Sequence, residues 1–261
     1  MYRREYLTTH RVSWCVGDSK RTMPGKKSTG AKLAWARKPA PTHGPKPSLS
    51  ADHITRVAIR LVDREGLAAL TMQRLAREVG LTTMALYRYF PGKADVVARM
   101  IDSAVDPPFH FGRPSSPWNK RLKEWARRCL AIYKVHPWFL EATAARQSPM
   151  GPNELLWMEA ALAMLAESGL RPKERHHAFL AIVGHVRGHA TFQQIRTSSG
   201  AGAQRARELA QWLQSDAERY PILLDALRSG VFNESVDGAF NFGIDCILDG
   251  IRAKGDRGQP R

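Results

Sequence analysis

The chain has 261 residues, of which 43% are hydrophobic, and 40 Lys and Arg against 24 Asp and Glu give it a formal net charge of +16. This length is enough for one or two domains with a substantial core, and the lack of any apolar run of about 18 residues excludes a membrane-spanning helix. The chain has three cysteines without the spacing of a disulfide framework or a metal site, and no secretion signal, so we expect a cytoplasmic protein.

The first 49 residues are expected to form a basic, disordered tail. They hold 11 Lys and Arg but only Glu5 and Asp18 as acidic residues, and so contribute +9 of the formal charge. No hydrophobic periodicity appears, and four prolines between positions 39 and 47 would interrupt a helix. Two interpretations stay open: the tail adds phosphate or minor-groove contacts to DNA, or Met23 is the true start and part of the tail is not made.

Residues 50–105 are predicted to form a small helical domain. Its first helix runs from about Ala51 to Glu65, with Ser50 as the N-cap and Gly66 at its end. Its last helix runs from about Lys93 to Val105 and ends before two consecutive prolines, because the residue before a proline resists the helical conformation.

Two short helices joined by a tight turn are predicted in the middle of this domain. Thr71 and Thr82 can each cap a helix, since a hydroxyl can accept a free backbone N–H of the first turn. Gly80 tolerates the left-handed conformation that ends the first helix. In the second helix, Leu86 and Phe90 are four residues apart and are expected to point inward. This arrangement is a helix-turn-helix, whose second helix can enter the major groove of DNA.

A specific motif ends the second helix: Leu-Tyr, one variable residue, Tyr-Phe, two further residues and Lys, which here spans Leu86 to Lys93. With this motif in register, the run from Ile54 to Ala104 resembles the DNA-binding head of tetracycline-repressor (TetR) family regulators. The other residues that carry the resemblance are Ala58, Leu61, Gly66, Thr71, Leu75, Ala76, Val79 and Gly80.

The resemblance implies which residues of the head contact DNA. Base contacts are expected from Thr83, Met84, Ala85 and Tyr87, and phosphate contacts from Thr71, Tyr87, Tyr89 and Lys93. Thr82, Gln73 and Arg88 complete the expected DNA-binding set. For the two tyrosines, packing between the helices is the alternative role. The outward face lacks Arg, Asn and Gln at the base-reading positions, so the sequence does not predict the operator.

The rest of the chain is predicted to be helical as well, with no strand pattern. Residues 106–117 read as a linker rich in Pro, Gly and Ser, residues 118–254 as a larger helical domain, and residues 255–261 as a disordered tail. Helices are expected at about 118–135, 138–147, 153–168, 173–196, 204–219, 221–228 and 234–253. The predicted fold class is therefore all-α, with a helix-turn-helix head and a larger body.

The body contains several short sequence motifs, and their order and spacing resemble those of the tetracycline-repressor-like branch of the family. They are Tyr133-x-x-His136-Pro137-Trp138, Gly151-Pro152, His185-Val186-Arg187-Gly188 and the closing Phe240-Asn241-Phe242-Gly243. This resemblance implies a homodimer formed by the long helix and the last helix, with the interface at Gly184, Gly188, Phe240, Gly243, Ile244 and Ile247. It also implies a ligand-binding domain, for which the pocket candidates are Trp125, Tyr133, Trp138, Trp157, Met158, Met164 and His185. Each of these seven residues can instead belong to an ordinary core.

The favoured function is a ligand-responsive transcriptional regulator. We expect a dimeric repressor that binds a palindromic operator in double-stranded DNA and is released by a small apolar or aromatic ligand. No cofactor and no membrane partner are expected. His185 and His189 have the i, i+4 spacing of metal ligands, but no third ligand stands nearby, so no metal site is predicted.

Two alternative functions belong to other classes. A nonspecific basic DNA-binding protein fits the charge of the tail. A helical enzyme is the weaker alternative, because the sequence shows no Ser-His-Asp arrangement, nucleophile elbow, phosphate loop or HExxH motif, and we assign no catalytic residue.

Overall fold

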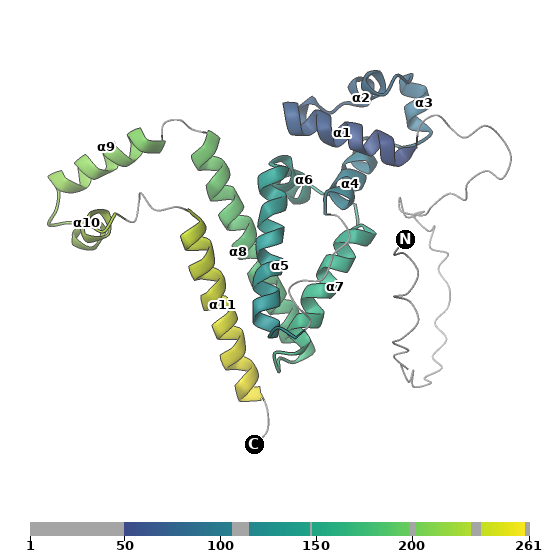
Figure 1. Cartoon of the computed structure of the whole chain (residues 1–261). Helices are drawn as coiled ribbons and strands as arrows, with labels where there is room; N and C mark the ends of the chain where they lie inside the picture. The colour runs from purple at the N-terminus through teal and green to yellow at the C-terminus, as the bar shows by residue number, and fades with distance from the viewer. Residues whose placement is uncertain (1–49, 106–114, 147, 199–201, 231–235, 259–261) are drawn as a thin grey trace, which may run out of the picture. The chain divides into compact units, whose positions relative to one another are not determined.

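The computed structural model of the chain describes residues 50–105, 115–146, 148–198, 202–230 and 236–258, all within one compact unit. Figure 1 shows helices throughout these segments, and no strand occurs in them, which confirms the predicted all-α fold class. Within the same segments, no helix combines the length and apolarity needed to cross a bilayer. The predicted tail, residues 1–49, and most of the predicted linker lie outside the described residues.

The helices of the head begin where the sequence signals predict. The elements of the head are α1 (Ala51–Glu65), the 3-10 turn η1 (Leu67–Ala69), α2 (Met72–Glu78), α3 (Thr83–Tyr87) and α4 (Lys93–Ala104). Helix α3 ends at Tyr87, so Phe90 lies after this helix and not within it. The hydroxyls of Ser50, Thr71 and Thr82 each accept the backbone N–H three residues later, at 3.1, 3.0 and 3.2 Å. Gly66 and Gly80 have φ angles of 81° and 67°, in the left-handed region that glycine adopts without strain.

A single apolar core holds these short helices together. Helices α2 and α3 have seven and five residues, and helices of that length are not stable alone in water. They are stabilised by tertiary packing, because each sends a fully buried leucine, Leu75 and Leu86, into the core between α1 and α4. Burying a leucine stabilises a fold by about 1.5–3 kcal/mol.

The body is built around one long helix. Its helices are α5 (Trp118–Val135), α6 (Trp138–Ala144), α7 (Pro152–Ala166), α8 (Pro172–Ser198), α9 (Gly202–Ser215), α10 (Pro221–Arg228) and α11 (Val236–Gly258). Helix α8 contacts α5, α7 and α11, and Figure 1 shows it between α5 and α11. Helices α9 and α10 pack on each other, with the rings of Trp212 and Tyr220 at a centroid distance of 5.0 Å.

Three helix ends in the body differ from the predictions, and the first is that of α9, which ends at Ser215 instead of at about residue 219. Helix α6 ends at Ala144, about one turn before the predicted end. Helix α11 continues to Gly258, so the predicted disordered tail is wrong for residues 255–258. This added turn lies close to the segment that follows α7, because a Cβ atom at Gly255 would overlap the backbone carbonyl oxygen of Ser168. Residues 259–261 lie outside the described residues.

Candidate DNA-binding surface and its links to the body

Helix α3 is fixed from its inner side. Leu86 is fully buried, and Phe90, one turn later, is 5% exposed. The turn between α2 and α3 is closed by the backbone N–H of Leu81, which donates to the carbonyl oxygen of Ala76 at 2.8 Å. The orientation of the short helix is therefore set by its inward leucine and by the turn before it.

The outer side of α3 is open to solvent and carries large side chains. Met84 is 78% exposed and Tyr87 is 44% exposed, although side chains of this size are usually covered in a folded domain. Arg88 is also exposed, whereas Thr83 and Ala85 are half-buried. Met84, Tyr87 and Arg88, which the sequence predicts to point outward, are thus all exposed, and Met84 is the most exposed large apolar side chain among them.

Tyr87 and Tyr89 have different surroundings. Tyr89 is half-buried and packs against the apolar core, which favours the packing role for its ring. Tyr87 presents its side chain to solvent next to Met84. Of the two tyrosines, Tyr87 is therefore the better placed to reach a DNA backbone.

The remaining DNA-contact candidates surround this face. Thr71, Gln73, Thr82 and Lys93 are all exposed. The oxygens of Thr71 and Thr82 are engaged as helix caps, but a hydroxyl that accepts a hydrogen bond still has its own hydrogen to donate to a phosphate.

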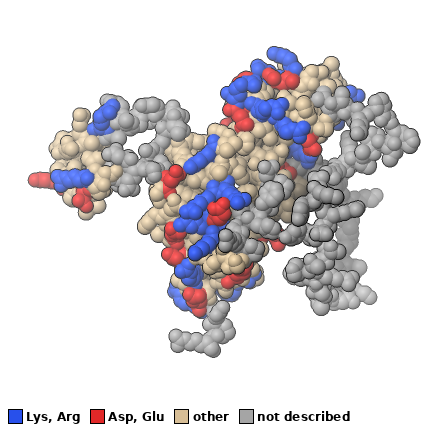
Figure 2. Space-filling view, viewed as in Figure 1, with Lys and Arg blue, Asp and Glu red and all other residues tan. Residues whose placement is uncertain are grey.

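Some basic side chains of the head are neutralised locally. Arg64 and Arg74 form ion pairs with Glu65 and Glu78 along α1 and α2, at distances of 2.7 to 4.0 Å. Figure 2 shows acidic and basic side chains mixed over this part of the molecule. Compensated pairs contribute little to attraction of DNA, whereas Arg88 and Lys93 are exposed and form no ion pair with a described carboxylate.

Two carboxylates whose partners the sequence does not reveal, one exposed and one buried, join the head to the body. The first is Asp63 at the end of α1. Its Oδ1 accepts the indole N–H of Trp138 at 2.6 Å and lies 2.7 Å from Nδ1 of His136. Both residues belong to the junction between α5 and α6, so the start of α6 is held directly on α1.

The second carboxylate, Asp102 on α4, caps α7 from outside that helix. Its Oδ1 accepts the backbone N–H groups of Asn153 and Glu154 at 2.7 and 3.2 Å, and its backbone carbonyl accepts the Asn153 side-chain amide at 2.9 Å. Burial raises the pKa of Asp102, and the two N–H bonds oppose that shift. A Cβ atom on Gly151 would overlap this carboxylate, so glycine is required there.

The aromatic and methionine residues predicted to line one pocket have several different sets of neighbours. Trp125 and Trp157 do come together, with ring centroids 6.1 Å apart and the indole N–H of Trp125 donating to the Trp157 carbonyl at 3.0 Å. Trp138 instead contacts the head through Asp63. Tyr133 packs edge-on against Phe139 at 5.4 Å. The other candidates are Met158 and Met164 on α7, half-buried and buried, and His185 on α8, half-buried.

Two predicted interface residues lie inside the subunit. Phe240 is 2% exposed and Ile244 is fully buried, so neither has surface to offer a partner, which corrects the prediction for both. Their side of α11 faces His185 and His189 of α8: the Phe240 ring stacks on His185 at 5.2 Å. Gly243 also has an internal role, because a Cβ atom there would overlap the His185 ring.

Other predicted interface residues do lie on the surface of the subunit. At Gly184 and Gly188 a Cβ atom would meet nothing within 4 Å, and Ile247 is half-buried. Large exposed apolar side chains accompany them on the same two helices: Leu180, Phe192, Ile195 and Phe242 are 51%, 67%, 54% and 73% exposed. A subunit alone leaves this apolar surface of α8 and α11 in water.

Two family models match the chain. The one described as "Bacterial regulatory proteins, tetR family" matches residues 54–100, and the one described as "Tetracyclin repressor-like, C-terminal domain" matches residues 111–254. The chain is 33% identical over 246 residues to the HTH-type transcriptional repressor DrrR1 of Streptomyces coeruleorubidus, which covers 90% of this chain and 89% of that protein. It is 26% identical to the class C tetracycline repressor protein of Escherichia coli, with coverage of 78% and 90%.

Solved structures share the fold. Apo ActR from Streptomyces coelicolor aligns with a TM-score of 0.72 at 23% identity and covers 82% of this chain and all of its own. ActR in complex with actinorhodin aligns with a TM-score of 0.72 at 24% identity, with coverage of 79% and 97%. The two domain matches and the relative at 33% identity together show that the chain belongs to the TetR family of bacterial regulatory proteins.

Proposed function

We propose that this protein is a sequence-specific transcriptional repressor whose α3 helix enters the major groove of DNA. The proposal is based on the difference between the buried and the exposed side of α3. Leu86 and Phe90 anchor its inner side, while Met84 and Tyr87 stand in solvent on its outer side. Thr and Met side chains can contact thymine methyl groups, and the Tyr87 hydroxyl can donate to a phosphate. The family membership and the repressor names of the relatives support this role.

The repressor is proposed to act as a homodimer through α8 and α11. Gly184 and Gly188 offer a flat surface that lets a second helix approach closely. Phe192 and Phe242 are large apolar side chains that a partner would cover. A twofold dimer presents two α3 helices, and a spacing of about 34 Å between them matches successive major grooves on one side of DNA.

A small ligand is proposed to release the dimer from its operator. ActR, which shares the fold, has been solved with actinorhodin and with (S)-DNPA. In this chain the Trp125–Trp157 pair is the most concentrated aromatic cluster among the predicted pocket residues. A ligand there touches α5 and α7, and α7 is tied to the head through Asp102. The proposed ligand is apolar or aromatic, and it acts by selecting a body conformation that moves α4.

Selection of bound fragments from random DNA by the full chain tests this function. The expected result is enrichment of one palindromic sequence with two half-sites about one helical turn apart. Enrichment of no sequence, with binding that depends only on salt, would favour the nonspecific basic DNA-binding protein that the charge of the tail also allows.

A further inference from the structure

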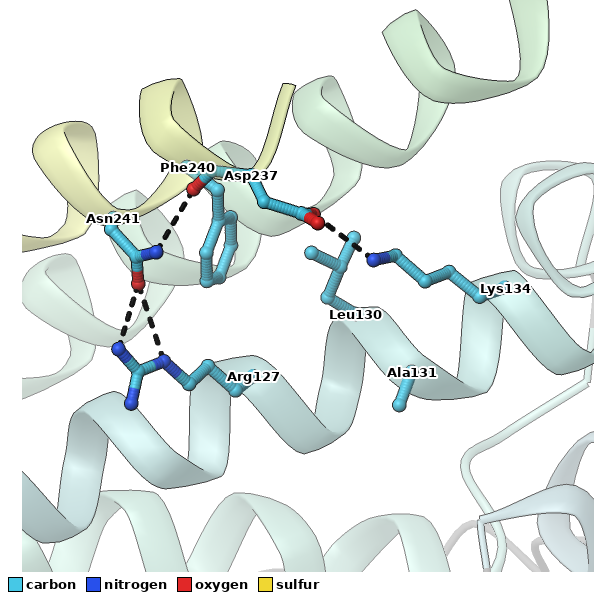
Figure 3. Close-up of a pocket in the computed structure, with 7 residues that line it drawn as sticks. All are labelled: Arg127, Leu130, Ala131, Lys134, Asp237, Phe240 and Asn241. Carbon is cyan, nitrogen blue, oxygen red and sulfur yellow. Dashed lines mark hydrogen bonds and ion pairs between the residues drawn. The ribbon is translucent and has the colours of Figure 1, made fainter. Parts of the chain in front are cut away.

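A surface groove separates α5 from the first turns of α11. Its volume is about 340 Å³, which is within the usual size of small-molecule sites. The lining residues are Arg127, Leu130, Ala131, Lys134, Asp237, Phe240 and Asn241. None of them is among the pocket residues predicted from the sequence. Figure 3 shows the Phe240 ring directed from α11 toward α5, between two polar contacts.

The first polar contact holds Arg127 without neutralising it. Its Nε and Nη2 donate to the amide oxygen of Asn241 at 3.2 and 2.8 Å. The Asn241 amide is oriented in turn by its own N–H bond to the Asp237 backbone carbonyl at 2.9 Å. Among the described residues no carboxylate pairs with Arg127, so its guanidinium is fixed in position and keeps its positive charge in the groove.

The second polar contact lies two helical turns along α5. Lys134 donates to Asp237 at 3.0 Å, and Gln193 on α8 donates to the same carboxylate oxygen at 3.3 Å. Lys134 and Arg127 are seven residues apart, which places them on one face of α5. The two cations and one carboxylate of the groove leave a net charge of +1.

Between the cations the floor is apolar. Leu130 and Phe240 are 4% and 2% exposed, and Ala131 completes the surface. The groove therefore sets an oriented guanidinium, which no described carboxylate pairs, beside a wall on which Ala131 is exposed and beneath which Leu130 and Phe240 lie buried. A neutral molecule would leave that guanidinium without an anion.

We propose that this groove is a binding site for a small carboxylate with a flat apolar body. The carboxylate would lie on Arg127, with Lys134 as the second cation, and the apolar body would lie over the exposed Ala131 and the aliphatic parts of the two basic side chains. Arg suits this role because its planar donors match the geometry of a carboxylate. The site is separate from the proposed Trp125–Trp157 site and does not depend on DNA binding.

Binding of 2-naphthoate to the full chain tests the proposal, with 2-naphthamide as the neutral molecule of the same shape. Calorimetry at pH 7.5 and low salt should give an affinity for 2-naphthoate about tenfold higher than for 2-naphthamide, because only the acid forms the charge-assisted bonds. Arg127→Gln and Lys134→Gln should each weaken 2-naphthoate about fivefold or more and leave 2-naphthamide unchanged.

The matched control is Arg128→Gln, the neighbouring arginine, which is exposed and paired with Glu124 at 3.0 Å outside the groove. It should leave both affinities unchanged. The melting temperature of each variant shows whether it is folded. If Arg127→Gln does not fold, Arg127→Lys replaces it in the test, and this variant should retain part of the affinity because it keeps the charge. Equal affinity for the acid and the amide, undetectable binding of the acid, or the same affinity in Arg127→Gln as in the native chain would overturn the proposal. Operator selection by the same variants reports on DNA binding separately.

Discussion

Tyr87 is an exposed tyrosine on α3, the helix proposed to enter the major groove. Its side chain is 44% exposed, so removing the hydroxyl leaves the packing of α3 in place. Tyr87→Phe should weaken operator binding by about 1–2 kcal/mol, roughly tenfold, if the hydroxyl donates to a phosphate. Fluorescence anisotropy with the selected operator measures this. Tyr220→Phe, in the α9–α10 pair, is the control, and an unchanged affinity in folded Tyr87→Phe would assign Tyr87 to packing.

His189 gives the body a dependence on pH. It is 6% exposed, and its Nε2 has no hydrogen-bond partner among the described residues. Burial, and to a smaller extent the neighbouring His185, lower its pKa from the ordinary value of 6.5, while Asp237 raises it and Lys134 lowers it. The folded chain therefore prefers the neutral imidazole, and protonation favours unfolding.

The resulting stability is present above pH 6.5 and is lost as pH falls through the folded-state pKa of His189. Between pH 7.5 and 5 the free energy of unfolding should therefore fall less for His189→Leu than for the native chain. The difference should be at most about 1.4 kcal/mol for each unit that separates the pKa of His189 in the unfolded and folded states. Urea unfolding at several pH values measures this, with the exposed His176→Leu as control. Identical pH profiles for the native chain and His189→Leu would show that His189 does not carry the effect.

At the scale of elements, α8 and α11 pack on each other through one side, and the other side of α8, with Gly188, is proposed to pack on a second subunit. Because a Cβ atom at Gly188 would have no atom of the described residues within 4 Å, Gly188→Leu should leave the fold intact. It should weaken the dimer by about 1–3 kcal/mol, the usual effect of an oversized side chain in a packed interface. Sedimentation velocity measures the dissociation, and Ala163→Leu, at an exposed position of α7, is the control. A fully dimeric Gly188→Leu would place this glycine outside the interface.

The joint between α4 and α7 depends on one carboxylate. Asp102→Ala removes the acceptor of two backbone N–H groups, at Asn153 and Glu154, and should destabilise the chain by about 1–3 kcal/mol. Asp102→Asn keeps an acceptor oxygen at the same position and should cost clearly less, because burial already disfavours the charged form. Urea unfolding compares the two variants. Equal losses for Ala and Asn would mean that the hydrogen bonds to α7 contribute little.

At the scale of the whole molecule, the local signals of the sequence were sufficient for the existence of the helices and for the caps of the head, but not for the ends of α6, α9 and α11. Ser50, Thr71, Thr82, Gly66 and Gly80 act within three or four residues of their own position, and the structure confirms each of them. Helix-turn-helix geometry follows from such signals, so the outward position of Met84 and Tyr87 was also predictable. What a side chain meets across the fold was much less predictable.

The links between distant segments have no local signature. Asp63 and Trp138 are 75 residues apart, and Asp102 and Asn153 are 51 apart, so nothing near either carboxylate indicates its partner. The same limit explains Phe240 and Ile244, which are apolar and spaced for a helix interface. Periodicity cannot distinguish a face that packs on α8 of the same chain from one that packs on a second copy.

If the folded head gives this chain its preference for one DNA sequence, that preference is measured by the affinity ratio between the selected palindrome and a scrambled duplex. The ratio is measured at about 150 mM salt for the full chain and for residues 50–261, which lack the basic tail. A specific repressor should show a ratio of about 10³ or more in both proteins, although both affinities fall when the tail is removed. A ratio near one, or a preference that disappears with the tail, would contradict the account.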